Sequence, residues 1–336
     1  MNRRQFLAAT AALAIGGQRA TLAADRLRGA TGFRSTAQSL GWIGTEAGIF
    51  KRLGLDVTFP ALETGGPDAA AGLLRGDWDF AETGSAPLIQ GVVEGRDTVI
   101  LLTPTAPAST GSALLARPGL AQPAQLAGAR IGVLTETGQT TIGVRVALRQ
   151  WGVNATLVPL GTFARVYAAL GAGEIDAGAL PLDYRFLGPR EFKLNVLDMP
   201  GGGFSSAAVG CTRRFIAGNR ARVARLVQGY VETIHFFKTR RADTIPLLQR
   251  FLMFNDRGAV EEAYDAYALL FQASPRPSAA GVERLIAELA RDRPAAASLS
   301  VDAVVDFSFL DDLDRRGLVR ALYAAERTGQ RAQRER

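Results

Sequence analysis

The sequence predicts an α/β fold of two lobes, followed by a helical C-terminal region. Strand-like and helix-like segments alternate from residue 27 to residue 102, which is typical of an α/β unit with a parallel sheet. The same alternation starts again at residue 125 and runs to residue 179. Every segment after about residue 208 reads as an amphipathic helix. We therefore expect lobe one in residues 25–112, lobe two in residues 113–207, and the second part of lobe one with the C-terminal helices in residues 208–336.

The expected strands are short apolar runs between turn residues. They are Leu27–Gly32, Leu55–Phe59, Trp78–Ala81, Thr98–Leu102, Ala129–Val133, Ala155–Leu160 and Ile175–Ala179. The expected helices have apolar residues three or four positions apart, and Asn219 and Ser278 are candidate caps. They are Ser39–Arg52, Asp68–Leu74, Pro87–Val93, a segment from Thr140 or Thr141 to Trp151, Phe163–Leu170, Asn219–Lys238, Ala242–Phe254, Ala259–Phe271, Ala279–Arg291 and Val301–Arg316.

A short internal repeat indicates that the two lobes are related. Leu73–Phe80 and Leu170–Ala177 each read as a helix end, a glycine turn, an acidic residue, an apolar residue and an Asp that enters a strand. Both segments stand at the equivalent place in their α/β unit. The repeat is short, and it supports a relation between the lobes mainly because both copies stand at equivalent positions.

The composition excludes several classes of protein. Of the 336 residues, 47% are apolar and 21% are charged, so the chain as a whole is neither disordered, collagen-like nor a coiled coil. Cys211 is the single cysteine and His235 the single histidine, which excludes an internal disulfide and argues against a zinc site or a His-based triad. We expect no cofactor and no metal, and both residues read as packing residues.

The first 24 residues read as a secretory signal peptide. Arg3 and Arg4 precede an apolar run from Phe6 to Gly17 that is short for a membrane span, and small residues follow it. The segment Asn2–Leu7 resembles a twin-arginine export signal; a general secretory signal or a retained anchor are the alternatives. We therefore expect a periplasmic protein.

Removal of the signal has consequences for partners. It lowers the formal net charge from +7 to +4, because the segment carries three arginines and no acidic residue. No basic stripe stands out, so nucleic-acid binding has little support. The only cysteine is far from the mature N-terminus, so we expect no lipid anchor.

Five motifs occur in order over nearly the whole mature chain. They lie in Trp42–Val57, Gly76–Ala81, Leu126–Val133, Gly173–Ala177 and Val305–Leu310. Together they resemble the periplasmic solute-binding proteins of ABC importers for nitrate, taurine and alkanesulfonates, which are related to the thiamine-precursor-binding type. Gln125 stands where this family often has Asp, and Ala129-Arg130 replaces its usual basic pair.

The resemblance implies a type II periplasmic binding protein fold. Two α/β lobes are joined by two hinge crossings and close on a ligand like a flytrap, and the helical C-terminal part packs on lobe one. We place the crossings near Leu102–Ser112 and Gly201–Cys211. The resemblance also implies an ABC permease in the inner membrane as partner. We expect a monomer.

Ligands of α/β folds bind beyond the carboxyl ends of the parallel strands, where helix N-termini offer free N–H groups. Four loops at such places are rich in hydroxyl and amide side chains. The candidate ligand-binding residues in and beside them are Thr36, Gln38, Trp42, Thr83, Ser85, Thr137, Gln139, Thr140, Asp183 and Tyr184.

Each of these residues also has a structural interpretation. In this second interpretation, the hydroxyls in the first three loops cap helices and contact no ligand, and Trp42 is a core residue. Asp183 suits a ligand amine, and Arg34 and Arg185 are the nearest candidate countercharges for an anion. Asp183 and Arg185 can equally be solvated surface groups.

The leading functional hypothesis is a binding protein without enzymatic activity. It would capture a small organic anion, such as a sulfonate, taurine or nitrate, and deliver it to the permease. The alternatives are a binding protein for a neutral or aromatic heterocycle, a ligand sensor for a membrane receptor, and an enzyme similar to the thiamine-precursor synthases.

Overall fold

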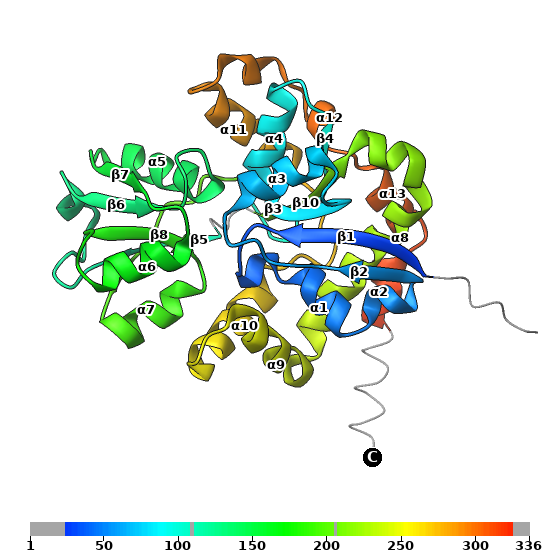
Figure 1. Cartoon of the computed structure of the whole chain (residues 1–336), viewed down its shortest axis with the longest axis horizontal. Helices are drawn as coiled ribbons and strands as arrows, with labels where there is room; N and C mark the ends of the chain where they lie inside the picture. Colours follow the sequence, from blue (N-terminus) through cyan, green and yellow to red (C-terminus); the bar gives the residue numbers. More distant parts are fainter. Residues whose placement is uncertain (1–23, 108–110, 205–206, 325–336) are drawn as a thin grey trace, which may run out of the picture.

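Two five-stranded sheets, each flanked by helices, form two lobes that lie side by side in Figure 1. The computed structural model describes residues 24–107, 111–204 and 207–324. The expected signal peptide therefore lies outside the described residues except for Ala24. The two-lobed α/β fold expected from the sequence is confirmed.

Lobe one contains the sheet with the order β2-β1-β3-β10-β4. Its strands are β1 (Asp25–Thr31), β2 (Leu55–Thr58), β3 (Phe80–Gly84), β4 (Thr98–Leu102) and β10 (Ala207–Thr212). Its helices are η1 (Thr36–Gln38), α1 (Leu40–Glu46), α2 (Ile49–Arg52), α3 (Gly66–Arg75), α4 (Ser85–Val93), α8 (Arg213–Thr239), α9 (Arg241–Leu252), α10 (Arg257–Leu270), α11 (Ala279–Ala290), η3 (Pro294–Ser298), α12 (Val301–Val304) and α13 (Ser308–Arg315).

Lobe two, drawn in green in Figure 1, contains the sheet with the order β7-β6-β8-β5-β9. Its strands are β5 (Ser112–Ala116), β6 (Arg130–Val133), β7 (Thr156–Pro159), β8 (Ala177–Pro181) and β9 (Asn195–Leu197). Its helices are η2 (Pro123–Leu126), α5 (Gln139–Trp151), α6 (Phe163–Gly171) and α7 (Tyr184–Phe192).

Both sheets are mixed, whereas the sequence pattern predicts parallel ones. In lobe one, β1 is parallel to β2 and β3, but β10 is antiparallel to β3 and β4. In lobe two, β6 is parallel to β7 and β8, but β5 is antiparallel to β8 and β9. The antiparallel strands β5 and β10 each follow a passage from the other lobe. Neither needs the helical crossover that a parallel neighbour requires.

The chain passes between the lobes twice, from β4 to β5 and from β9 to β10. The second passage ends earlier than the expected Gly201–Cys211, because residues 207–211 already pair with lobe one as part of β10. We retain the division of the chain into residues 25–112, 113–207 and 208–336 as a proposal.

The internal repeat corresponds to one hydrogen-bonding arrangement that occurs in both lobes. Asp79 accepts a hydrogen bond from the backbone N–H of Arg28 at 2.7 Å, and Asp176 accepts one from Arg130 N–H at 2.9 Å. Gly76 and Gly173 both have a positive φ, 79° and 72°, at the preceding turn. Each Asp therefore ties the strand it precedes to the central parallel strand.

Three expected helices differ in detail. Gly48, with φ 69°, separates α1 from α2, which were expected as one helix. Val305 pairs with Ile100 of β4, so the expected helix Val301–Arg316 is divided into α12 and α13. Asn219 lies inside α8 with non-helical angles; the cap of this helix is Thr212, whose side chain accepts the N–H of Phe215.

A carboxyl group is buried in the core of lobe one. Glu82 on β3 is 1% exposed, and its Oε1 accepts the N–H of Gly41 at 2.9 Å. Tyr230 of α8 is its other polar neighbour. Burial disfavours the charged carboxylate and raises the pKa of Glu82 to about 8.

This burial predicts a specific dependence of stability on pH. Protonated Glu82 contributes stability fully below its unfolded-state pKa of 4.5, and the contribution is lost as pH rises through about 8. Glu82→Gln cannot ionise, so urea unfolding should show the wild type losing a few kcal/mol relative to this variant over that interval, at about 1.4 kcal/mol per pKa unit. Glu283→Gln, on the exposed side of α11, is the control. Parallel curves for wild type and Glu82→Gln would contradict the assignment.

Candidate functional site

A small cavity lies between the lobes, beyond the ends of the parallel strands. Its volume is about 30 Å³, enough for one or two water molecules. Residues of both lobes line it, among them Phe33, Ser35, Gln38, Pro67, Gly84, Leu134, Gln139 and Thr140. None of the described residues that line it is charged. The expected countercharges lie elsewhere: Arg34 pairs with Glu63, and Arg185 pairs with Asp198 at 3.2 Å.

Gln139 reaches across the cavity to the start of α4. Its Oε1 accepts the N–H of Ala86 at 2.9 Å. The approach is close because Gly84 has no side chain: a Cβ there would lie 2.7 Å from Gln139 Cβ. A side chain of lobe two therefore accepts the hydrogen bond from Ala86 N–H, one of the helix N-terminal groups that were expected to bind the ligand.

Asp183 makes a second connection between the lobes. It is fully buried, and its carboxylate accepts hydrogen bonds from the N–H of Thr36, at 3.2 Å to each oxygen, and from the Thr36 hydroxyl. Tyr184 and Tyr267 are its other titratable neighbours. Burial outweighs these hydrogen bonds and raises the pKa of Asp183 to about 6. Asp183 is thus not a solvated surface group.

Gln38 and Thr140 also line the cavity, from opposite lobes. Gln38 is held in place because its Oε1 accepts a hydrogen bond from the Thr31 hydroxyl at 2.7 Å. Thr140 lies in the first turn of α5, whose first N–H groups have no partner within the helix. Together with Gln139, these are the candidate residues that the structure brings to the cavity wall.

Several buried hydroxyls beside the cavity have no hydrogen-bond partner among the described residues. Ser35, on the wall, is 1% exposed. Thr83 and Ser85 flank the wall residue Gly84 and are 0% and 3% exposed. Buried polar groups are nearly always paired, so these hydroxyls are available to a polar ligand or to water in the cavity.

Besides Thr36 and Asp183, which bond to each other, three candidate residues lie away from the cavity wall. Trp42 packs against Phe251 of α9, with ring centroids 5.5 Å apart, which is the structural alternative. The ring of Tyr184 contacts Phe254 in lobe one, with centroids 5.3 Å apart. The carbonyl of Thr137 accepts a hydrogen bond from Gln90 Nε2 at 3.3 Å.

The sequence analysis missed the apolar part of the wall. Phe33, Pro67 and Leu134 line the cavity, and Phe33 contacts Phe163 of lobe two edge to face at 4.7 Å. The available signal was position: Leu134 directly follows β6, and Phe33 comes two residues after the end of β1. Apolar residues at the ends of parallel strands can line a site as hydrogen-bonding ones do.

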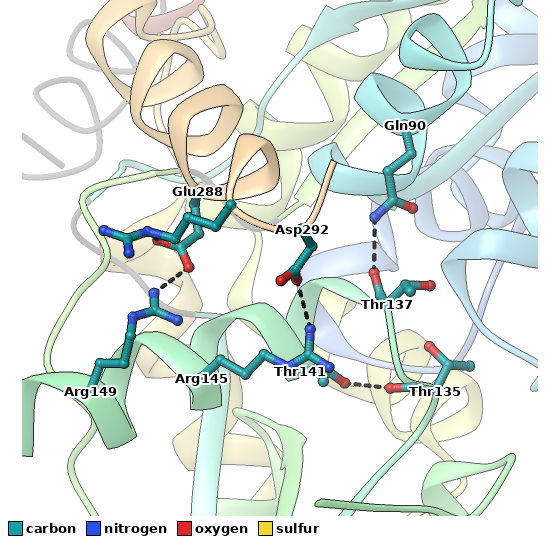
Figure 2. Close-up of polar contacts among 9 residues, drawn as sticks. Gln90, Thr135, Thr137, Thr141, Arg145, Arg149, Glu288 and Asp292 are labelled. Carbon is teal, nitrogen blue, oxygen red and sulfur yellow. Dashed lines mark hydrogen bonds and ion pairs between the residues drawn. The ribbon is translucent and has the colours of Figure 1, made fainter. Parts of the chain in front are cut away.

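Ion pairs connect the lobes on both sides of the cavity. On one side, shown in Figure 2, Arg145 pairs with Asp292 at 2.9 Å, and Arg149 pairs with Glu288. On the other side, Arg190 of α7 pairs with acidic residues at the start of α10, Glu262 at 2.8 Å and Asp256 at 3.6 Å. In these pairs the arginine belongs to lobe two and the acid to lobe one.

The single histidine and the single cysteine, residue types that often act in catalysis, do not line the cavity. His235 is on α8, with its ring against Tyr323. Cys211 is buried in β10, and burial raises the pKa of its thiol above the usual range. Within the described ranges, no group of three or more His, Cys, Asp or Glu is placed to hold a metal ion.

The raised pKa of Asp183 predicts that lobe closure depends on pH. If opening exposes Asp183, its pKa returns toward the usual 3.8, so closure takes up a proton. The contribution to closure is complete below 3.8 and is lost as pH rises through about 6. Small-angle scattering of the ligand-free protein should show a radius of gyration that increases over this interval. In Asp183→Asn the pH dependence should be absent; an equal increase in that variant would contradict the assignment.

The ion pair of Arg149 with Glu288 connects the two lobes, so exchanging the two charges should partly restore closure that either single charge reversal weakens. Arg149→Glu and Glu288→Arg should each weaken closure, and the double variant should restore it in part, because Glu288 also pairs with Arg291 of its own lobe; the expected coupling for this partly exposed pair is about 0.2–1 kcal/mol. The measurement is the closed fraction reported by fluorescence energy transfer between labels on the two lobes, in low and high salt. Additive effects of the two substitutions would show that the pair does not contribute to closure.

Comparison with known proteins agrees with this architecture. Among curated protein sequences, none matches the chain at a significant level. The alkanesulfonate-binding protein SsuA from Xanthomonas axonopodis pv. citri, bound to MOPS, is 18% identical, with a TM-score of 0.70, 84% of this chain covered and 98% of that one. The periplasmic aliphatic sulphonate binding protein SsuA from Escherichia coli is 18% identical, with a TM-score of 0.64 and coverages of 83% and 91%.

A third similar structure is a DSZB variant in complex with biphenyl-2-sulfinic acid. It is 17% identical, with a TM-score of 0.61, and the alignment covers 87% of this chain and 99% of that one. At such identities these structures show the fold alone, which is that of periplasmic solute-binding proteins. A sequence model described as "NMT1/THI5 like" matches residues 40–236, more than half of the chain. The protein therefore belongs to the NMT1/THI5-like family.

Proposed function

We propose that this protein is the extracytoplasmic solute-binding component of an ABC importer and that it captures a small organic anion of the sulfonate type between its lobes. The observation that carries the proposal is the cavity, which both lobes enclose and which combines unpaired hydrogen-bonding groups with an apolar wall. Binding without turnover is part of the proposal.

The polar groups at the cavity are suited to an oxyanion. The hydroxyls of Ser35 and Ser85 are unpaired donors, and the first residues of α5, whose N–H groups have no partner within the helix, lie on the cavity wall. Such donors, together with the helix dipole, can hold an anion without a cationic side chain. Phe33, Pro67 and Leu134 would offer an apolar surface to the organic part of the ligand once the lobes part, because the closed cavity of about 30 Å³ has room only for water.

The ligands of the similar structures support this choice. The Xanthomonas protein is an alkanesulfonate-binding protein with bound MOPS, the Escherichia coli protein binds aliphatic sulphonates, and the DSZB variant holds an aromatic sulfinic acid. A neutral or aromatic solute is the second candidate, because no described residue on the wall is charged. Nitrate and taurine are further candidate ligands, and the thermal-shift panel described below includes them.

A ligand that contacts both lobes would stabilise the closed form. The closed form brings surfaces of both lobes together, and we propose that a permease recognises this combined surface. We further propose export by a twin-arginine signal in residues 1–24, a periplasmic location without a lipid anchor, and a monomer. No helix in the described ranges is long and apolar enough to cross a membrane. A sensor that presents the same closed form to a membrane receptor is the alternative to transport.

A thermal-shift panel on residues 25–336 tests the ligand. It compares alkyl and aryl sulfonates, taurine, nitrate and the neutral sulfonamide isosteres of the sulfonates. A ligand at 100 times its Kd should stabilise the protein by about 2.7 kcal/mol, or a few degrees in Tm. We expect sulfonates to raise Tm and sulfonamides to have little effect.

The cavity itself is tested with Ser35→Ala. Loss of one hydrogen bond to the ligand should weaken sulfonate binding by about 0.5–1.5 kcal/mol in calorimetric titration. Ser298→Ala, at an exposed position on η3, is the matched control and should bind as the wild type does. Equal Tm shifts from sulfonates and sulfonamides would favour the neutral solute, and unchanged binding by Ser35→Ala would place the ligand elsewhere.

A further inference from the structure

Gln139 stands where a ligand oxygen is expected. We propose that Gln139 is an internal substitute for the ligand: in the empty protein its carboxamide caps α4 across the cleft, and a bound oxyanion displaces it. Gln139 is then a specificity-determining residue, since only a solute with a stronger hydrogen-bond acceptor completes the exchange. This inference rests on the proposed function for the nature of the ligand.

The geometry of the cap is the first step. Gln139 Oε1 accepts the Ala86 N–H at 2.9 Å, although the two residues belong to different lobes. Ala86 is the second of the nine residues of α4, and the third residue, Pro87, has no N–H to offer. Ala86 N–H is therefore a principal donor at this end of α4, and it already has an acceptor.

The second step is that the cap leaves polar groups unsatisfied. Gln139 Nε2 is buried without a partner among the described residues. The Ser85 hydroxyl at the start of α4 and the Ser35 hydroxyl on the cavity wall are also unpaired, at 3% and 1% exposure. The carboxamide thus satisfies one donor while three other polar groups remain without partners. An oxyanion with several acceptor oxygens can accept from Ala86 N–H and from both hydroxyls at once, while the displaced Gln139 amide turns away from the site.

The third step is that exchange is sterically required. The lobes meet so closely at Gly84 that a Cβ there would lie 2.7 Å from Gln139 Cβ. The adjoining cavity has a volume of only about 30 Å³. A ligand that reaches Ala86 N–H must therefore take the space of the Gln139 carboxamide. Admission of an organic anion therefore requires that the Gln139 side chain rotate away and that the lobes part to enlarge the cavity.

Selectivity follows from the relative strength of the two acceptors. A charged oxygen accepts a stronger hydrogen bond than an amide carbonyl, so a sulfonate displaces the cap and a neutral isostere displaces it less readily. A carboxylate at position 139 would bind Ala86 N–H more strongly and repel an incoming anion. Gln139→Glu is therefore expected to reject sulfonates, whereas Gln139→Met has a side chain of similar length that cannot cap.

The cap is tested first without any ligand. Amide hydrogen exchange at Ala86, followed by NMR, should be at least about tenfold faster in Gln139→Met than in the wild type, since an unbonded N–H exchanges from a more open state. Gln122→Met, at an exposed position in lobe two, is the control and should leave Ala86 unchanged. Circular dichroism verifies that each variant folds. Equal exchange at Ala86 in wild type and Gln139→Met would overturn the cap.

The exchange is tested with two probes, ethanesulfonate and its neutral isostere ethanesulfonamide. Gln139→Glu should raise the Kd for ethanesulfonate at least about tenfold and change the Kd for ethanesulfonamide much less. Equal losses for both probes would overturn the specificity role. If the wild type binds neither probe, the sulfonate assignment and the displacement fail together. The ligand-free measurement still decides separately whether Gln139 caps α4.

Discussion

The structure is organised by the need of backbone N–H groups at the starts of helices and strands to find acceptors. At the start of α4 the acceptor is Gln139, and at the start of η1 it is Asp183; both come from the opposite lobe. Within the lobes, Asp79 and Asp176 do the same for the central strands. Because a buried N–H without an acceptor is costly, these few side chains fix both the shape of each lobe and the way the lobes meet.

This constraint also explains the composition of the cavity. The cross-lobe acceptors use donors of lobe one, so the groups left for a ligand are unpaired hydroxyls, one amide nitrogen and the start of α5. The charged groups lie further out, in the ion pairs of Arg145, Arg149 and Arg190. A small uncharged chamber with an apolar side is thus enclosed by a charged seam. Gln139 belongs to both groups of contacts, because it connects the lobes and also lines the cavity.

Much of the fold could be predicted from sequence because the signals are local. Glycine turns, such as Gly76, and alternating apolar segments marked most of the parallel strands and their helices. Strands β5 and β10 were missed because small residues make up most of them, and these residues owe their strand conformation to neighbours distant in sequence. The Val305 pairing with Ile100 was missed for a similar reason, whereas the break at Gly48 comes from a local left-handed glycine conformation.

The site was predicted less completely. The loops that carry Gln38, Gln139 and Thr140 were found, since they follow strands of a recognisable pattern. The partners of Asp183 and Gln139 were not, because Thr36 and Ala86 lie 147 and 53 residues away in the chain. Ion pairs such as Arg149 with Glu288, 139 residues apart, have no local signal at all. Such contacts depend on how the two lobes meet.

Because Cys211 is buried, the reaction of its thiol with a labelling reagent can report whether the sheet of lobe one is intact. The thiol lies in β10, between β3 and β4, and is shielded from solvent. Opening and closing of the cleft moves one lobe against the other and leaves this sheet intact, so a thiol reagent reaches Cys211 only when β10 separates from its neighbours. The rate of labelling therefore measures disruption of lobe one, independently of the cleft, in a chain that needs no engineered cysteine.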